Sequence, residues 1–376
     1  MRITSAVACR ASLAKLEVDF ILSSSSPIQQ PGAQRCPIGE TGQEQHSLRS
    51  ASAQLIKELV WSTVRFRPAK KPICIYSSRR SGSTLLMQMI SANRGVMFSD
   101  QPFGLYSISS ANINRLPVFA YSQIACPDED EAAIVRNYVQ RLFNGQIRAN
   151  APWKFWGRDF HFFNDRICLK ITDAKAIIDW IDQQFDVHTV VLTRHPIAQV
   201  LSVANNRWLT TGKGLLKNAG FVEQWLTSDL EAMCWDLYRR GTELEGRVVD
   251  WALENLVPLT LLPDRPKWLW VSYEDLITHT PTVIDELAGE LQLDDRKSMA
   301  RQVFRPSRSV RGASSLERQR LIHERDRDRL VDWWRAKISA DELLACFRVL
   351  DRFGIDLYRP DTSLPDHRRV GRGGFA

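Results

Sequence analysis

Short apolar segments alternate with longer helical patterns between residues 71 and 358, and this alternation limits the folds open to the chain. The apolar segments are residues 72–76, 95–98, 167–171, 188–193 and 268–272. Two runs within them, ICLKI and VVLT, are largely apolar at successive positions, which is typical of strands buried on both faces of a parallel sheet. The pattern therefore predicts an α/β fold, a doubly wound parallel sheet of four to five strands flanked by helices.

Helical periodicity fills the intervals between these strands and the region after them. The predicted helices span residues 82–93, 129–142, 174–185, 196–206, 221–253, 281–291, 316–337 and 340–353. In a sheet of this kind, ligands bind beyond the carboxyl ends of the strands. We therefore expect the segments after residues 76 and 193, together with Lys170, to face one crevice.

The two ends of the chain differ in composition from this central region. Residues 23–53 are rich in Ser, Gln, Gly and Pro, and Arg10 interrupts the apolar run before them, which argues against a secretory signal. The Arg- and Ser-containing start also allows a transit peptide. We expect a poorly ordered extension over 1–53, one domain over 54–360 and a flexible tail over 361–376.

The bulk composition predicts a soluble, cytoplasmic protein. Apolar residues make up 44% and charged residues 25% of the 376 residues, and no run of eighteen apolar residues suggests a membrane span. The seven cysteines are scattered without a C-x-x-C pair, so neither a disulfide framework nor a zinc site is expected.

The net charge of +7 has one concentration of basic residues, at residues 296–335. Acidic residues are mixed into this stretch, which favours a solvated helix face, with an anion site as the second interpretation. Nucleic-acid binding is not expected, because aromatic and basic residues do not interleave there.

The sequence YSSRRSGSTLL, residues 76–86, joins the first predicted strand to the first predicted helix. A strand, a Gly/Ser turn and a helix N-terminus together form a phosphate-binding loop. Gly82 lets the backbone approach an anion, and the Arg80 guanidinium can bind two oxygens at once. Ser83 stands where ATP- and GTP-binding loops carry lysine, which argues against γ-phosphate transfer. A simple strand-to-helix turn capped by Ser81 is the alternative.

A second segment, VVLTRHPIAQVLSVANN, runs from residue 190 to 206. Arg194 stands at the carboxyl end of a predicted strand, Pro196 begins the next helix, and Ser202 lies about two turns further on. An arginine and a serine in these positions predict a second anion pocket. The alternative is that Arg194 caps the strand or forms a surface ion pair.

Together the two motifs resemble those of sulfotransferases that use 3′-phosphoadenosine-5′-phosphosulfate (PAPS). That family's first loop reads Lys or Arg, Ser or Thr, Gly, then two residues that are Ser or Thr. Its second segment reads Arg, then Asp, His or Asn, then Pro, with a serine eight residues after the arginine. This chain has RSGST at 80–84 and RHP at 194–196, with Ser202 at that spacing. The segments LKITDAKAIIDWI, VSYEDL and CFRVLDRFGIDLY are further similarities, so the resemblance covers roughly residues 71–358.

The resemblance implies a P-loop-like fold, PAPS as the co-substrate and catalysis without a metal. The first loop would hold the 5′-phosphosulfate and the second segment the 3′-phosphate, with the segment RPSRSVRGASS closing over the nucleotide. The implied nucleotide-binding residues are Arg80, Ser81, Gly82, Ser83, Thr84, Arg194, Ser202, Arg311 and Gly312. Arg80 and Lys170 would stabilise the departing phosphate oxygen; Lys170 as a structural lysine at a strand end is the alternative.

The residue that takes the acceptor's proton does not follow from either family pattern. Carbohydrate-type members carry a Glu-Pro pair after the second strand, but this chain has Gln101, and a neutral amide cannot accept the proton. Cytosolic members carry a histidine close after the third-strand lysine, where this chain has Thr172 and then Asp173. Asp100 is the leading substitute, and Asp173 and His161 follow. An N-cap role is the alternative for Asp100.

We therefore predict an enzyme that transfers a sulfuryl group from PAPS to a hydroxyl of a carbohydrate or small metabolite. Several tryptophans near the motifs could line an acceptor pocket or pack in the core: Trp153, Trp156, Trp208 and Trp225. Two other functions stay open. One is a non-catalytic nucleotide-binding relative, which Gln101 favours. The other is an atypical P-loop kinase, which would need a magnesium-binding carboxylate at the end of a strand. The strand ends Thr193, Lys170 and Ser272 disfavour it.

Overall fold

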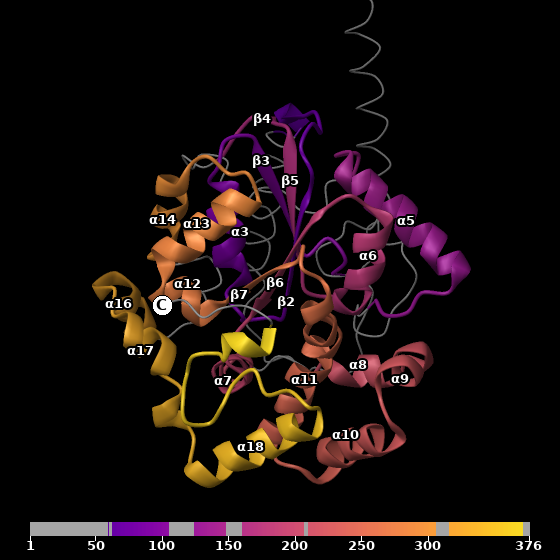
Figure 1. Ribbon diagram of the computed structural model, residues 1–376, viewed down its shortest axis with the longest axis vertical. Coiled ribbons are helices and arrows are strands. Elements are labelled where there is room, and N and C mark those ends of the chain that lie inside the picture. Colours follow the sequence, from indigo (N-terminus) through magenta and orange to yellow (C-terminus); the bar gives the residue numbers. More distant parts are fainter. Residues whose placement is uncertain are drawn as a thin grey trace, which may run out of the picture. The chain divides into compact units, whose positions relative to one another are not determined.

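The computed structural model describes residue 59 and residues 62–104, 124–147, 160–206, 210–305 and 316–370, with the backbone alone at 316–318 (Figure 1). All of these residues belong to one compact unit. The predicted N-terminal extension, 1–53, lies outside the described residues.

Five parallel strands form the central sheet, which confirms the predicted α/β class. In order across the sheet they are β3 (Val96–Asp100), β5 (Arg166–Ile171), β2 (Ile73–Ser77), β6 (His188–Thr193) and β7 (Leu269–Ser272). Every residue of β2, β5 and β7 is buried, as their apolar runs predicted. The register pairs Tyr76 with Ile171 and Val191, and Thr193 with Ser272, so the carboxyl ends of these strands meet at one edge.

Helices cover both faces of this sheet (Figure 1). One face packs against α3 (Ser83–Ser91), α12 (Tyr273–Thr278), α13 (Thr280–Glu290) and α14 (Arg296–Val303). The other packs against α5 (Glu129–Phe143), α6 (Ile178–Gln184), α7 (Pro196–Ala204), α11 (Glu243–Leu261) and α18 (Ala340–Arg352). Alternate side chains of β2 point to opposite faces of the sheet. Ile73 and Ile75 pack in the core on the α3 face, whereas Cys74 and Tyr76 pack in the core on the α11 face.

The order in which the chain adds strands to the sheet changes side at β2. It passes from β2 to the edge strand β3, returns through β5, and then continues beyond β2 to β6 and β7. The segment after β2 leads to α3 on one face, whereas the segments after β5 and β6 lead to α6 and α7 on the other. Such a switch point opens a crevice beyond the carboxyl ends of the strands. Most of the expected site residues follow these three strands or lie on them, and Asp100 ends β3.

The single helix predicted over residues 221–253 is wrong. The structure has three helices there, α9 (Ala219–Trp225), α10 (Ser228–Arg240) and α11, after a short α8 (Gly212–Leu216). Thr227 and Thr242 cap α10 and α11 by accepting hydrogen bonds from backbone N–H groups, and Gly241 ends α10. The Thr242 and Glu245 capping box was readable in the sequence, but continuous periodicity concealed it.

The helix predicted over 316–337 is also interrupted. It is divided into α16 (Leu316–Glu324), α17 (Arg327–Asp332) and a 3-10 turn at Arg335–Lys337. Arg325 has a positive φ of 59°, and the Asp326 side chain caps α17, so the break has a local cause. A separate two-stranded parallel sheet, β1 (Arg65–Phe66) with β4 (Phe163–Asn164), was not predicted at all.

Residues 361–370 are the described part of the segment predicted as a tail. They contain a 3-10 turn, His367–Val370, and the Val370 side chain is buried in the core. His367 Nε2 lies 2.9 Å from Asp275 Oδ2 on α12. Among the described helices, none combines the length and the apolar character that a membrane crossing requires.

Candidate functional site

The loop between β2 and α3 is a compact turn whose backbone depends on Gly82. Gly82 precedes α3 with a left-handed φ of 97°, and a Cβ at this position would lie 2.5 Å from Tyr273 Cδ2. Ser81 Oγ donates to the Ser78 carbonyl at 2.6 Å, which closes the turn. Gly82 is the N-cap of α3 and makes no side-chain hydrogen bond to it. The N–H groups at a helix N-terminus favour an anion.

Arg80 joins this loop to α7. Its Nε donates to Ser202 Oγ at 3.1 Å, and its backbone oxygen accepts a hydrogen bond from Arg194 Nη1 at 2.9 Å. The Arg194 guanidinium also lies 4.4 Å from the centre of the Tyr273 ring. The two sequence motifs, separated by more than one hundred residues, therefore form one positively charged cluster at the carboxyl ends of β2 and β6.

Lys170 brings a third strand to the same cluster. It lies on β5, its side chain is only 6% exposed, and its Nζ is 3.4 Å from Thr84 Oγ1 at the start of α3. Asp100, the last residue of β3, pairs with Lys170 Nζ at 2.5 Å. The sequence-based candidates Arg80, Lys170 and Asp100 thus follow or end three different strands at one edge of the sheet.

Lys175 holds the loop after β2 by a hydrogen bond to Ser78, and the sequence analysis did not identify it. Its buried Nζ donates to Ser78 Oγ at 2.8 Å and to Asn255 Oδ1 at 2.6 Å. Asn255 in α11 in turn donates to the Ser78 oxygen at 3.3 Å. Burial lowers the pKa of Lys175 to about 7, although the charge of Glu254 acts in the opposite direction. A lysine within the apolar stretch LKITDAKAIIDWI was the available signal.

Asp173 places a second carboxylate at this edge of the sheet. It follows β5, is half-buried, and its Oδ2 accepts a hydrogen bond from Thr172 Oγ1 at 3.0 Å. Burial raises the pKa of Asp173 to about 6. The hydrogen bond and the charges of Arg79 and Lys170 lower this pKa, and the charge of Glu254 raises it.

A buried polar network holds the segment after β6. Glu274 accepts hydrogen bonds from the His195 backbone N–H and from the Tyr358 hydroxyl, both at 3.0 Å. Burial raises the pKa of Glu274 to about 7. The His195 ring stacks on Trp334 with 4.3 Å between ring centres, and burial lowers the pKa of His195 to about 3. A neutral, packed histidine of this kind orients the chain before α7.

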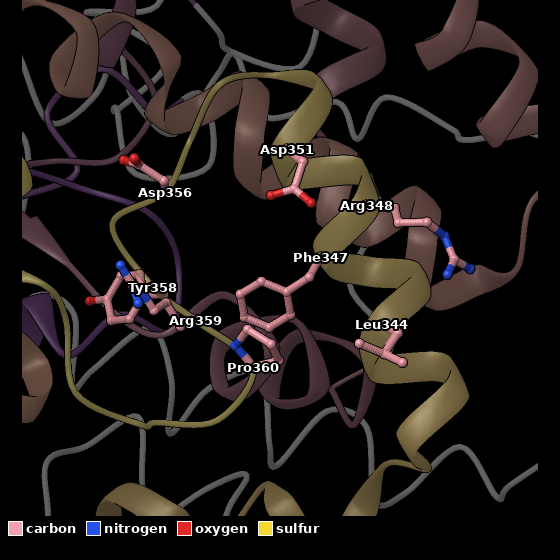
Figure 2. Close-up of a pocket in the computed structure, with 8 residues that line it drawn as sticks. All are labelled: Leu344, Phe347, Arg348, Asp351, Asp356, Tyr358, Arg359 and Pro360. Atoms are coloured by element: carbon pink, nitrogen blue, oxygen red, sulfur yellow. The ribbon is translucent and has the colours of Figure 1, made fainter.

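A surface pocket of about 330 Å³ borders this network through Tyr358. Figure 2 shows its lining from α18 on one side and from residues 356–360 on the other. Its remaining lining residues belong neither to the loop after β2 nor to α7. The pocket is therefore separate from the crevice that holds the motif residues.

Other sequence-based candidates have different positions. Gln101 follows β3 with a positive φ of 53° and donates its backbone N–H to the Lys170 carbonyl at 2.8 Å. His161 lies in the segment before β4 and β5, whereas the motif residues lie near or after the carboxyl ends of strands. Trp225 ends α9 and is half-buried against the core. Five candidates lie outside the described residues: Arg311, Gly312, Trp153, Trp156 and Trp208.

Over the described ranges, no three His, Cys, Asp or Glu side chains form a group that could hold a metal ion. Side chains place positive charge at this edge of the sheet. Arg80 belongs to the loop and contacts Ser202 on α7, Lys170 contacts Thr84 at the start of α3, and Arg194 contacts the loop backbone. This arrangement can bind an anion with several oxygens and can stabilise negative charge that develops on it.

Two solved structures are similar to this chain. A sulfotransferase domain from the curacin biosynthetic pathway has 16% identity and a TM-score of 0.42, with 76% of this chain and 98% of that chain covered. Mouse sulfotransferase SULT7A1, complexed with PAP, has 11% identity and a TM-score of 0.36, with 78% and 88% covered. No protein-family model and no curated protein sequence matches. A function must therefore be argued from the residues of the site.

We predict that Gly82→Ala will destabilise the protein and weaken anion binding in the loop. A left-handed backbone costs an alanine about 1–2 kcal/mol, and here the added Cβ also meets the Tyr273 ring. Gly354→Ala is the matched control, because Gly354 has a φ of 68° and open space around it. Urea unfolding should show a larger loss for Gly82→Ala; equal losses would contradict the close contact with Tyr273.

We also predict that Lys175 makes the protein more stable as pH rises above 7. The pKa of Lys175 is about 7 in the folded protein and about 10.4 in an unfolded chain. Between these values the unfolded state binds more protons, so the free energy of unfolding should rise by about 2 kcal/mol from pH 7 to 9. Lys175→Met should remove this increment, as measured by urea unfolding at both pH values. If the free energy of unfolding changes with pH in the same way in both proteins, Lys175 stays charged in the folded protein.

Proposed function

We propose that this chain is a sulfotransferase that moves a sulfuryl group from PAPS to a hydroxyl of a carbohydrate or small metabolite. The observation that carries the proposal is the double contact of Arg80, with Ser202 on α7 and, through its carbonyl, with Arg194. It joins the loop after β2 to the segment after β6. A donor with phosphate groups at both its 5′ and 3′ positions requires two adjacent anion sites of this kind.

The two anionic ends of the donor would bind different residues of the positively charged cluster. The 5′-phosphosulfate would accept hydrogen bonds from the N–H groups at the start of α3 and from the hydroxyls of Ser83 and Thr84. The 3′-phosphate would bind Ser202 and Arg194, and Arg80 would lie between the two. The hydrogen bond from Arg80 Nε to Ser202 Oγ joins the two sites. Phosphate oxygens would replace it with charge-assisted bonds, which are about twice as strong.

The transfer step requires positive charge at the oxygen that leaves. A bond forms between the acceptor oxygen and sulfur, and the bond between sulfur and the 5′-phosphate oxygen breaks. The electron pair stays on that phosphate oxygen, where Arg80 and Lys170 would stabilise it. The sulfuryl group carries less charge than a terminal phosphoryl group, which is consistent with a loop that has Ser83 in place of lysine. The acceptor's proton passes to a carboxylate, for which Asp100 and Asp173 are the candidates.

A non-catalytic nucleotide-binding protein is the second candidate function. Two features favour it: Gln101 replaces the glutamate expected after β3, and Asp100 is already paired with Lys170. Such a protein would bind PAP without turning over PAPS. The kinase alternative needs a strand that ends in a magnesium-binding carboxylate. Among the strands of the sheet only β3 ends in one, and that residue, Asp100, is paired with Lys170.

We predict that Ser202→Ala will weaken PAP binding about 3- to 10-fold, which corresponds to one lost hydrogen bond to a charged group. Arg194→Lys should weaken it further, because lysine cannot contact phosphate and the Arg80 carbonyl with the same planar geometry. Isothermal titration calorimetry with PAP measures both. Ser228→Ala, at the first turn of the distant helix α10, is the control. Wild-type affinity in Ser202→Ala would remove this serine from the 3′-phosphate site.

Turnover separates the two candidate functions. Labelled PAPS should transfer its sulfuryl group to at least one member of a panel of sugars, phenols and hydroxylated lipids. Transfer should persist in EDTA, because arginine and lysine side chains supply the positive charge. PAP binding without any transfer would favour the non-catalytic protein. Strict dependence on magnesium would contradict the proposed chemistry.

A further inference from the structure

We propose that Asp173, supplied by the turn after β5, is the residue that takes the proton from the acceptor hydroxyl. This inference rests on the proposed sulfotransferase function and assigns the role that the sequence left open. In the resembling enzymes of the carbohydrate type, the carboxylate comes from the turn after β3. Here that turn carries Gln101, and the carboxylate that adjoins it comes from the neighbouring strand.

The turn after β3 packs directly on the Asp173 carboxylate. Gly104 closes this turn by donating its N–H to the Gln101 carbonyl at 3.0 Å. A Cβ on Gly104 would lie 2.9 Å from Asp173 Oδ2 and 3.4 Å from Gln101 Cβ. Asp173 Oδ2 is therefore adjacent to the Gln101 turn, and a side chain at position 104 would displace it. The strand register makes this possible, because β3 and β5 are neighbours with Asp100 opposite Lys170.

The surroundings of Asp173 suit a group that alternates between ionised and protonated forms. Thr172 Oγ1 donates to Oδ2, so among the described contacts Oδ1 is the oxygen that can face an acceptor. Three charged groups act on the carboxylate: Arg79 from the loop after β2, Lys170 from β5, and Glu254 from α11. Burial raises its pKa to about 6, and a base is most effective when its pKa lies near the working pH.

Asp100 is less suited to the same role because of its partner. Its carboxylate lies 2.5 Å from Lys170 Nζ, and both side chains are largely buried, at 13% and 6% exposed. A proton on Asp100 would leave the buried Lys170 ammonium without its counter-charge, which is unfavourable. Asp100 therefore acts as a positioning residue that holds Lys170 near Thr84 and the leaving oxygen.

In the resulting step the acceptor oxygen bonds to sulfur while its proton moves to Asp173 Oδ1. The bond from sulfur to the 5′-phosphate oxygen breaks at the same time, and its electron pair stays on PAP. The proton later leaves Asp173 to solvent. No other reactant is needed, so the step balances with PAPS and the acceptor alone.

The test compares Asp173→Asn with Asp100→Asn, using labelled PAPS and the acceptor that the panel identifies. We expect Asp173→Asn to lower kcat by about 100-fold or more while PAP affinity stays at the wild-type value. The wild-type rate should rise with pH to a plateau above about 6, since only ionised Asp173 accepts a proton. Asp173→Asn should lose this rise, whereas Asp100→Asn should keep it even if kcat falls.

Gly104→Ala tests the geometry without changing any charge. Its Cβ should displace the Asp173 carboxylate, lower kcat and leave PAP binding unchanged. Gly289→Ala in α13, with open space around Gly289, is the matched control. Asp186→Asn controls for loss of a carboxylate, because Asp186 is 87% exposed just before the amino end of β6.

Each outcome decides the proposal. If Asp173→Asn keeps the wild-type kcat and pH profile, the proposal is overturned. If Asp100→Asn instead loses the increase of the rate with pH, the base is Asp100. A wild-type protein that binds PAP but transfers nothing would overturn the enzymatic function itself, and the base with it. A wild-type protein that does not bind PAP would overturn the donor site.

Discussion

The contacts of Arg80 fix the relation between the loop after β2 and the segment after β6. Its guanidinium reaches Ser202 on α7 while its carbonyl accepts from Arg194, so both ends of one residue are held. Arg80 adopts a left-handed φ of 66° to do this, which costs a non-glycine residue about 1 kcal/mol or more. Tyr273 extends the connection to β7, since its ring lies against both Gly82 and Arg194. The segments that follow β2, β6 and β7 are therefore in contact with one another.

Buried charge is concentrated at the same edge of the sheet. Lys170 pairs with Asp100, Lys175 is held by Ser78 and Asn255, and Glu274 is hydrogen-bonded by the backbone and by a tyrosine. Burying such groups is unfavourable unless each has partners, and the partners here come from the neighbouring strand β3, from loops and from helices. Burial lowers the pKa of Lys175 and raises that of Glu274, and shifted pKa values are typical of functional sites. Arg166, at the amino end of β5, is instead held by backbone carbonyls, as expected of a structural residue.

The strands and the turn from β2 into α3 were predictable because their signals are local. Apolar runs identify strands buried on both faces, and RSGST after such a run identifies the turn into α3. The helices of 219–261 were merged because periodicity continues through their caps at Thr227 and Thr242. Lys175 was missed because its partner Asn255 lies eighty residues later on one of those helices. Its role depends on tertiary packing, which no local pattern contains.

The position proposed for the proton acceptor, at Asp173, depends on a general property of parallel sheets. Neighbouring parallel strands end at the same edge, so the turns that follow them lie side by side although they are distant in sequence. A carboxylate can therefore be exchanged between the turn after β3 and the turn after β5 without moving the reaction centre. The close approach of Gly104 to Asp173 shows that these two turns are in contact. A sequence comparison by position would read Gln101 as a lost base, whereas the sheet register makes Asp173 its spatial neighbour.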